Sequence, residues 1–393
     1  MKKALAMILC IIMLFSFGIV VFAENGTKTT AESEISADSP QPELKMNVKS
    51  AVLMEASTGK ILYSKNESSA MAPASVTKIM TLLLAAEALA AGNFKLEDKV
   101  VISEYAASMG GSQVFLEEGE EITVEELFKS TIIASANDSA VALAELVSGS
   151  ESIFVSKMNA KAMELSMSST NFENVTGLDD TTVNHVTSAL DIAIMSRELI
   201  KHDIITKYSS LWQDSIRNGE FILTNTNRLV RYYDGCNGLK TGSTDKAGFC
   251  MSASAKRDGM QLIAVVMGAD TRDVRNNAAK TLLDYGFSSF SLYERAEERL
   301  EDATILGGTV DSGTLYSAPF SVLIAKGARV ECEYQIPNEL CAPIEAGQSV
   351  GKVIYKIGEE IIGESDVYLK ESVGKIGYFE LYTRLIMTLF GKC

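Results

Sequence analysis

Three short clusters of polar residues follow one another along the chain, and their side chains could together catalyse acyl transfer. They are Ser75-Val-Thr-Lys78, Ser135-Ala-Asn137 and Lys240-Thr-Gly242. The first cluster supplies a serine and an amine, and a serine hydroxyl needs an adjacent base to attack at neutral pH. The second adds a hydroxyl and an amide. The third places a cation on a predicted strand, where it could bind a carboxylate.

The order and spacing of the clusters carry more information than any one of them. Ser-x-x-Lys begins at Ser57, Ser75, Ser243, Ser349 and Ser372, and Ser-x-Asn begins at Ser64, Ser135 and Ser169. Lys-Thr-Gly occurs once, and its three residues lie about 105 residues beyond Ser135 and about 165 beyond Ser75. Only Ser75 from the first set and Ser135 from the second give the three clusters in order, with spacings of about 60 and then about 105 residues.

The proposed base works only in a particular environment. On a helix, Lys78 lies one turn beyond Ser75 on the same face, so its amine can reach the hydroxyl. An exposed lysine has a pKa of about 10.4 and would be protonated at neutral pH. Burial and a second cation such as Lys240 would lower that pKa and free the lone pair. The clusters are therefore expected to meet in the fold.

With their flanking residues, these clusters resemble the low-molecular-mass penicillin-binding proteins, serine D-alanyl-D-alanine carboxypeptidases of the peptidase S11 family. The resemblance covers roughly residues 47 to 290. It rests on the segments Pro73-Ala-Ser-Val-Thr-Lys-Ile-Met-Thr81, Ala134-Ser-Ala-Asn-Asp-Ser-Ala140, Asn174-Val-Thr-Gly-Leu-Asp179, Asn237-Gly-Leu-Lys-Thr-Gly-Ser-Thr-Asp-Lys-Ala-Gly-Phe-Cys250 and Leu283-Asp-Tyr-Gly-Phe287.

The resemblance implies a role for each matching residue. Ser75 is the expected nucleophile, Lys78 its general base, and Ser135 the group that passes a proton to the leaving D-alanine. Asn137 is expected either to bond a substrate carbonyl or to fix Lys78. The other expected substrate-binding residues are Lys240, Thr241, Gly242, Ser243 and Arg275.

Within that second group, Lys240 and Thr241 would bind the terminal carboxylate, and Gly242 would leave room for the substrate beside the strand. The backbone N–H groups of Ser75 and Ser243 would form the oxyanion hole. Arg275 matches a family arginine that helps to bind the carboxylate, with an ordinary cation on a helix surface as the alternative. His185 is expected to be structural, because a lysine base makes a Ser-His-Asp triad unnecessary.

Hydrophobic patterns predict an α+β fold. A hairpin over 50–64 and strands over 248–255 and 261–268 would form an antiparallel sheet. Helices are predicted from Pro73 to about Ala91 and over 124–147, 152–165, 187–201 and 276–285. The resemblance implies that these elements form a penicillin-binding, β-lactamase-like transpeptidase domain with a helical block over residues 47–290.

Two further segments follow that domain. Short apolar runs divided by Gly and Pro predict a small all-β domain over 298–372, which the family also has. Residues 376–393 form an amphipathic helix whose apolar stripe is Tyr378, Phe379, Tyr382, Leu385, Ile386, Leu389 and Phe390. We expect this helix to lie in the membrane plane, since a span needs about 20 apolar residues. The alternative is a helix docked on its own β domain.

The N-terminus predicts export. Residues 1–23 resemble a secretory signal, with Lys2 and Lys3, an apolar run and cleavage expected after Ala23. An uncleaved anchor is the alternative. Residues 24–46 read as a flexible linker. These features place the protein on the outer face of the cytoplasmic membrane, held peripherally by the C-terminal helix.

Charge and cysteine content narrow the possible partners. The net charge is −15, so nucleic acid is excluded as a partner. No cofactor and no metal site are expected, because the cysteines lack metal-ligand spacing and only two histidines are present. Cys236 with Cys250, or Cys332 with Cys341, could form disulfides in an oxidising exterior, and free buried thiols are the alternative.

The predicted function is removal of the terminal D-alanine from peptidoglycan stem pentapeptides through an acyl-enzyme on Ser75, with β-lactams as inhibitors. A D,D-endopeptidase of the same family would use the same chemistry. A class A-like β-lactamase would need a Glu-x-x-Leu-Asn element, which Glu164 and Glu173 do not provide. A non-catalytic β-lactam or wall-sensing module would not need both Ser75 and Lys78.

Overall fold

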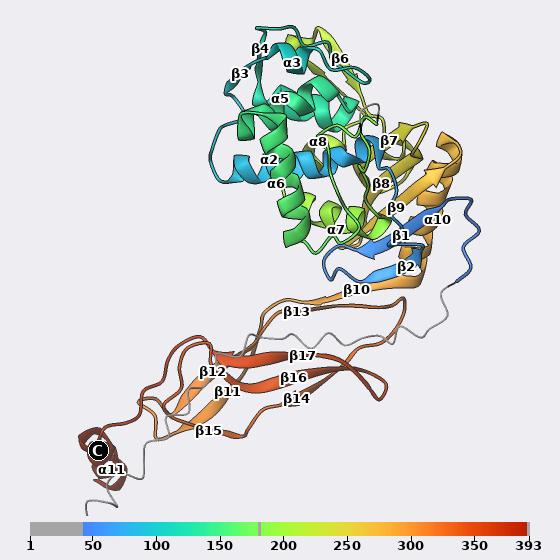
Figure 1. The fold of residues 1–393 in the computed structure, drawn as a ribbon. Coiled ribbons are helices and arrows are strands. Elements are labelled where there is room, and N and C mark those ends of the chain that lie inside the picture. The colour runs from blue at the N-terminus through green and yellow to red at the C-terminus, as the bar shows by residue number, and fades with distance from the viewer. Residues whose placement is uncertain (1–41, 180–181, 391–393) are drawn as a thin grey trace, which may run out of the picture.

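An antiparallel sheet of five strands organises the N-terminal part of the molecule (Figure 1). The computed structural model describes residues 42–179 and 182–390. The predicted signal, 1–23, and most of the predicted linker lie outside these residues. The strand order is β2-β1-β9-β8-β7, with bounds β1 Ser50–Glu55, β2 Ile61–Lys65, β7 Cys236–Thr244, β8 Gly248–Arg257 and β9 Met260–Ala269.

The sheet has a core on each face, and alternate residues of the central strands β1 and β9 serve the two cores. In β1, Val52 and Met54 join the core on the side of the helical block, whereas Ala51 and Leu53 join the core beneath helix α10. This is why the central strands lack the alternation of apolar and polar residues that a half-exposed sheet shows. Strand β7 lies at one edge, paired only with β8 within this sheet.

Helices and two small hairpins cover the first face of the sheet. Their bounds are α2 Lys78–Ala90, α3 Glu104–Ala107, α4 Val124–Lys129, α5 Asn137–Ser148, α6 Glu151–Glu164, α7 Ala189–Leu199, α8 Asp203–Ser209, β3 Lys99–Val101, β4 Glu121–Thr123, β5 Gln213–Ile216 and β6 Phe221–Thr224. Helix α9, Leu229–Tyr232, joins the other core through Leu229. Short turns of other helix types are η1 Ala74–Thr77, η2 Ser130–Ala134 and η3 Arg217–Gly219. Helix α10, Arg272–Ser289, packs against the opposite face.

One predicted helix is interrupted. The sequence predicts a continuous helix over 124–147, but α4 ends at Lys129 and a π-helical turn leads to Ser135, which has φ +63° and ψ 29°. The prediction was wrong because hydrophobic spacing does not register a single residue in the left-handed region. Such π turns are frequent at functional sites.

The C-terminal part is all-β, as predicted. Its six strands have the order β14-β16-β17-β12-β11-β15, with bounds β11 Glu298–Leu306, β12 Ser312–Ser317, β14 Glu331–Gln335, β15 Glu339–Cys341, β16 Ser349–Ile357 and β17 Glu360–Leu369. A two-stranded ribbon, β10 Phe290–Arg295 with β13 Phe320–Ala325, joins it to the first part (Figure 1). The C-terminal β part has a core of its own, in which the ring of Phe320 stacks on that of Tyr355 with centroids 3.9 Å apart.

The chain ends in helix α11, Tyr378–Phe390, and none of its residues is buried. Arg384 donates hydrogen bonds to Asp311 and to the carbonyl of Thr309, which tie the polar side of the helix to the β domain. The residues of the apolar stripe are all exposed, so the helix contacts the β domain through Arg384 without burying that stripe. Within the described residues, no helix combines the length and apolar character needed to cross a bilayer.

The four described cysteines are free thiols. Cys236 and Cys250 are buried, which agrees with the free-thiol alternative. Cys332 lies on β14 and Cys341 on β15, and these strands are at opposite edges of the six-stranded sheet. Neither of the two possible disulfides is therefore present.

Candidate active site

The nucleophile and its base meet at the start of α2. Ser75 lies in the η1 turn and Lys78 opens the helix, as the predicted one-turn spacing requires. Nζ of Lys78 lies 3.0 Å from Oγ of Ser75 and donates to the carbonyl oxygen of Thr176 at 2.8 Å. The prediction that Lys78 reaches the hydroxyl is confirmed by this distance.

The environment of Lys78 favours its neutral form. The side chain is fully buried, and burial lowers its pKa well below the ordinary value. The charge of Lys240 lowers it further, and Asp138 opposes these effects. A neutral amine can accept the proton of a serine hydroxyl, so Lys78 has the position and the pKa direction that a general base needs.

Strand β7 packs directly on the nucleophile turn at Gly242. A Cβ atom on Gly242 would lie 2.8 Å from the backbone nitrogen of Ser75 and 3.0 Å from Cβ of Ala74. The sequence predicted that Gly242 leaves room for substrate. The structure gives an additional reason, since any side chain here would displace the backbone of Ser75. This contact also sets the backbone of the next residue, Ser243, beside the same turn.

Lys240 and Thr241 of β7 and Arg275 of α10 form a buried cationic region. Lys240 is 1 % exposed, and burial together with the nearby charge of Arg275 lowers its pKa to about 7. Arg275 is 3 % exposed and donates to Oδ1 of Asn276 at 3.0 and 3.2 Å, so it is not an ordinary surface cation. Burial, and then Arg272, lowers its pKa to about 10. Such cations gain most from an anionic partner.

Ser135 and Asn137 present buried polar atoms without partners among the described residues. These are Oγ of Ser135 and Oδ1 of Asn137. Buried polar groups are almost always hydrogen-bonded, so these atoms are suited to a bound substrate. Nδ2 of Asn137 donates to the carbonyl of Gly110 at 2.6 Å. No hydrogen bond joins Asn137 to Lys78 in this structure, where the amine of Lys78 donates to the carbonyl of Thr176 instead.

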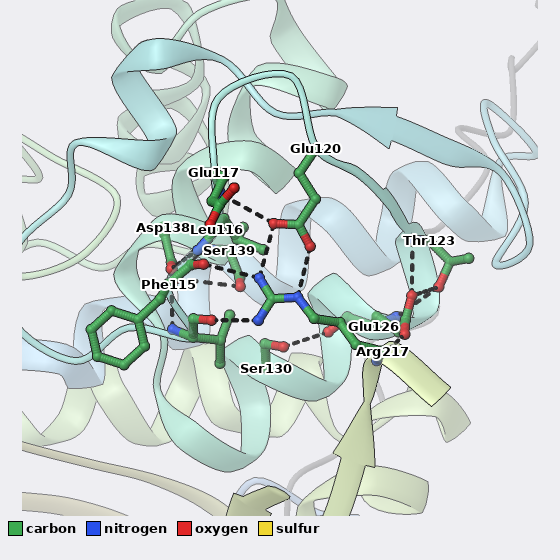
Figure 2. A network of polar contacts seen from close by, with 11 residues as sticks. Phe115, Leu116, Glu117, Glu120, Thr123, Glu126, Ser130, Asp138, Ser139 and Arg217 are labelled. Carbon is green, nitrogen blue, oxygen red and sulfur yellow. Dashed lines mark hydrogen bonds and ion pairs between the residues drawn. The ribbon is translucent and has the colours of Figure 1, made fainter. Parts of the chain in front are cut away.

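A polar network holds the loop of residues 110–120, which lies beside Asn137 (Figure 2). Arg217 donates to both carboxylate oxygens of Glu120, at 2.7 and 2.9 Å, and to the carbonyls of Val114 and Phe115. From the other side, the carboxylate of Asp138 accepts the N–H groups of Val114 and Leu116, both at 3.1 Å. The loop is thus held by Arg217 on one side and by Asp138, the residue after Asn137, on the other.

Sequence reasoning missed three residues that shape the active site. Thr176 acts through a backbone carbonyl, which leaves no side-chain signature. Asp138 and Arg217 act by shaping the surroundings, and only the position of Asp138 inside the matching 134–140 segment could have drawn attention to it. Within residues 42–179 and 182–390, no three His, Cys, Asp or Glu side chains are grouped so as to hold a metal ion.

Comparison with known proteins supports the assignment over nearly the whole chain. The sequence model described as "D-alanyl-D-alanine carboxypeptidase" (peptidase S11) matches residues 35–271, and that of "Penicillin-binding protein 5, C-terminal domain" matches residues 287–375. The chain is 44% identical to D-alanyl-D-alanine carboxypeptidase DacF of Bacillus subtilis over 98% of both chains. It is 32% identical to DacC of Escherichia coli over 93% of this chain and 92% of the other.

Solved structures agree with this. Penicillin-binding protein 5 from Haemophilus influenzae has a TM-score of 0.72 at 31% identity, over 86% of this chain and all of that one. Penicillin-binding protein D2 from Listeria monocytogenes, in an ampicillin-bound form, has a TM-score of 0.58 at 29% identity, over 63% of this chain and all of that one. The chain therefore belongs to the peptidase S11 family of penicillin-binding proteins and is a serine-type D-alanyl-D-alanine carboxypeptidase, a hydrolase.

Proposed function

We propose that the chain removes the terminal D-alanine of peptidoglycan stem pentapeptides through an acyl-enzyme on Ser75. The observation that carries this proposal is the 3.0 Å approach of Lys78 to Ser75 in a buried setting that lowers the pKa of the amine. Lys240, Thr241 and Arg275 would bind the carboxylate of the terminal residue. Asn137 would donate the second N–H of its side-chain amide to a peptide carbonyl of the stem, while its Oδ1 is free to accept an N–H of the substrate.

The reaction follows from these positions. Lys78 takes the hydroxyl proton as Oγ of Ser75 bonds to the carbonyl carbon of the penultimate D-alanine. The oxyanion is held by the backbone N–H groups of Ser75 and Ser243. The C–N bond then breaks while Ser135 delivers its proton to the leaving nitrogen and receives the proton held by Lys78, which returns the amine to its neutral form. Water hydrolyses the ester and restores the Ser75 hydroxyl.

β-Lactams would acylate the same serine. Their ring amide carbonyl takes the place of the scissile peptide, and their carboxylate takes the place of the terminal one. The ampicillin-bound relative supports this proposal. Because the ring nitrogen stays attached to the acyl group, the adduct is easier to trap than the peptide acyl-enzyme.

We propose the following arrangement for the rest of the chain: a cleaved signal over 1–23, a linker over 24–46, the catalytic domain over 47–290, the β domain over 298–372 and a membrane-binding helix over 376–393. The enzyme would then act on the outer face of the cytoplasmic membrane. The exposed apolar side chains of α11 support peripheral binding, since Phe379 is 87 % exposed and Leu389 is 68 % exposed.

The test combines labelled penicillin with two peptide substrates. Wild-type protein should form a covalent adduct that Ser75→Ala abolishes, and it should release D-alanine from a synthetic pentapeptide. An adduct that survives Ser75→Ala would refute the assignment of the nucleophile. Faster cleavage of a cross-linked dimer than of the pentapeptide would show that the enzyme is chiefly an endopeptidase.

A further inference from the structure

The residue before the nucleophile has a strained backbone. Ala74 has φ +50°, a conformation that residues with a Cβ adopt uncommonly. Its carbonyl oxygen accepts a hydrogen bond from Oγ1 of Thr77 at 2.9 Å. Gly177 packs on the same carbonyl so closely that a Cβ there would lie 1.8 Å from the oxygen. The direction of Ser75 therefore depends on contacts that hold Ala74 in place.

The hydroxyl of Thr77 is itself held by His185. Nε2 of His185 lies 2.8 Å from Oγ1 of Thr77. Because the single proton of that hydroxyl is donated to Ala74, Thr77 must accept the Nε2–H of His185. On the other side of the ring, the N–H of Glu173 donates to Nδ1 at 3.0 Å. These contacts fix one neutral tautomer of the imidazole.

The surroundings maintain that neutral form. Thr77 is fully buried and His185 is 3 % exposed, with Phe172 against the ring edge at a centroid distance of 5.8 Å. The charged groups that act on the ring are Glu173, Lys246 and Asp179. Burial exceeds their effects and lowers the pKa of His185 to about 4. A protonated ring would turn a donor toward the N–H of Glu173 and break the relay.

One segment links this relay to the base. Glu173 donates its N–H to His185, and three residues later the carbonyl of Thr176 accepts a hydrogen bond from Lys78. Residues 173–177 therefore contact the nucleophile turn and the base together. A change in the relay would shift Ser75 relative to Lys78 without removing either side chain.

We propose that His185 is a positioning residue for the nucleophile, acting through Thr77 on the backbone of Ala74. This role rests on the proposed function of Ser75 and Lys78. His185 does not contact the reacting atoms. Its neutral Nε2–H orients the Thr77 hydroxyl, and that hydroxyl holds the strained turn that points Oγ of Ser75 at its base.

Two matched pairs of variants test the proposal. Thr77→Val keeps the shape of the side chain but lacks the hydroxyl, whereas Thr77→Ser keeps the hydroxyl. His185→Gln places an amide donor near the position of Nε2, whereas His185→Asn places it near Nδ1. The measurement is the rate constant for Ser75 acylation by labelled penicillin, per active site, with KM against kcat for pentapeptide hydrolysis.

We expect Thr77→Val and His185→Asn to lower the acylation rate constant about 100-fold with little change in KM, because a shift of about 1 Å can cost that much. Thr77→Ser and His185→Gln should stay close to the wild-type rate. The Val and Asn changes combined should cost no more than either alone, because the two residues act as one unit.

The contrary outcomes are distinct. If Thr77→Val or His185→Asn lowers the melting temperature but acylates at the wild-type rate per active site, the positioning role is wrong. If Thr77→Ser fails as badly as Thr77→Val, the hydroxyl is not the functional group and the relay is also wrong. If the wild-type protein gives no adduct on Ser75, the proposed function fails before the relay is tested.

Discussion

Nζ of Lys78 lies 3.0 Å from Oγ of Ser75, and both residues belong to a single turn at the start of α2. The amine also donates a hydrogen bond to the carbonyl oxygen of Thr176, and this bond fixes the orientation of Nζ beside Ser75. Burial removes the water that would otherwise stabilise an ammonium ion. This pair therefore combines the geometry of a nucleophile and base with a burial that lowers the pKa of the base.

Lys78→Arg is expected to abolish acylation although it keeps a cation and much of the side-chain volume. A guanidinium is effectively always protonated, so it cannot take the proton of Ser75. General-base catalysis contributes about 10²- to 10⁴-fold, and a loss of that size is expected. The measurement is the rate of adduct formation with labelled penicillin. Wild-type acylation by the arginine variant would contradict the role of Lys78.

The saturating acylation rate should rise with pH until Lys78 is neutral. The folded pKa of Lys78 is lowered well below its ordinary value, first by burial and then by Lys240, so this rise should occur well below pH 10. Lys240→Gln removes the second cation and raises the pKa of Lys78. Its acid limb should therefore move to higher pH than in the wild type. An unchanged or lower midpoint would contradict the coupling.

The same pH series should report on the carboxylate site. Burial and Arg275 lower the pKa of Lys240 to about 7, so its positive charge is lost as the pH rises past that value. We expect the KM for pentapeptide to increase above about pH 7, while the acylation rate at saturation does not fall. A KM that is independent of pH between 6 and 9 would argue against Lys240 as the main carboxylate partner.

Gly242→Ala should impair the enzyme through the nucleophile turn. The new Cβ would lie 2.8 Å from the backbone nitrogen of Ser75, and that distance must increase by moving β7 or the turn. Overpacking of this kind costs about 1–3 kcal/mol of stability. Thermal unfolding and penicillin acylation should both be affected.

The matched control is Gly374→Ala, because the nearest atom to a Cβ there is a methyl carbon of Thr309 at 3.7 Å. It should leave both measurements unchanged. Equal behaviour of the two alanine variants would show that the close approach of β7 to Ser75 is not a constraint.

These residues also show how far sequence reasoning could go. The approach of Lys78 to Ser75 was predictable from helix periodicity, which places residues three apart on one face. The strand that carries Lys240 was predicted from the Lys-Thr-Gly motif and the family resemblance. The left-handed conformation of Ser135 was not, because it follows a π turn that breaks a regular apolar pattern. The Thr176 carbonyl was not predictable either, since every residue carries that group and only the tertiary fold selects one.

The clamp between Arg217 and Glu120 gives a prediction about stability and activity together. Hydrogen bonding to Arg217 lowers the pKa of Glu120 in the folded protein. The ionised Glu120 therefore adds to the free energy of unfolding above the ordinary glutamate pKa, and this stabilisation is lost as the pH falls through the folded pKa. Arg217→Met should cost about 1–2 kcal/mol near neutral pH, since hydrogen bonds to charged groups contribute about that much when partly exposed. The loss relative to the wild type should shrink in acid.

Acylation by penicillin should also slow in Arg217→Met, because the loop that holds Asn137 is released on one side. Glu121→Gln is the control, since its ion pair with Lys99 is more than half exposed and lies next along the chain. That variant should behave as the wild type in both measurements. A purely structural clamp would lower the unfolding temperature of Arg217→Met and leave the acylation rate per active site unchanged.

Membrane binding by α11 can be tested with charges placed on opposite sides of one helix. Leu385 and Leu389 lie in the apolar stripe and are 54 % and 68 % exposed, whereas Thr388 lies outside that stripe. Burying a leucine contributes about 1.5–3 kcal/mol, so Leu385→Glu with Leu389→Glu should weaken binding to anionic lipid vesicles about 100-fold or more.

Thr388→Glu adds charge to the same helix and should bind nearly as the wild type. Co-sedimentation with vesicles measures both, and pentapeptide hydrolysis in solution should be unchanged because α11 lies at the opposite end of the molecule from α2, the helix that begins at Lys78 (Figure 1). If both sets of charges weaken binding equally, electrostatic repulsion rather than the apolar stripe governs attachment, and the interfacial helix is refuted.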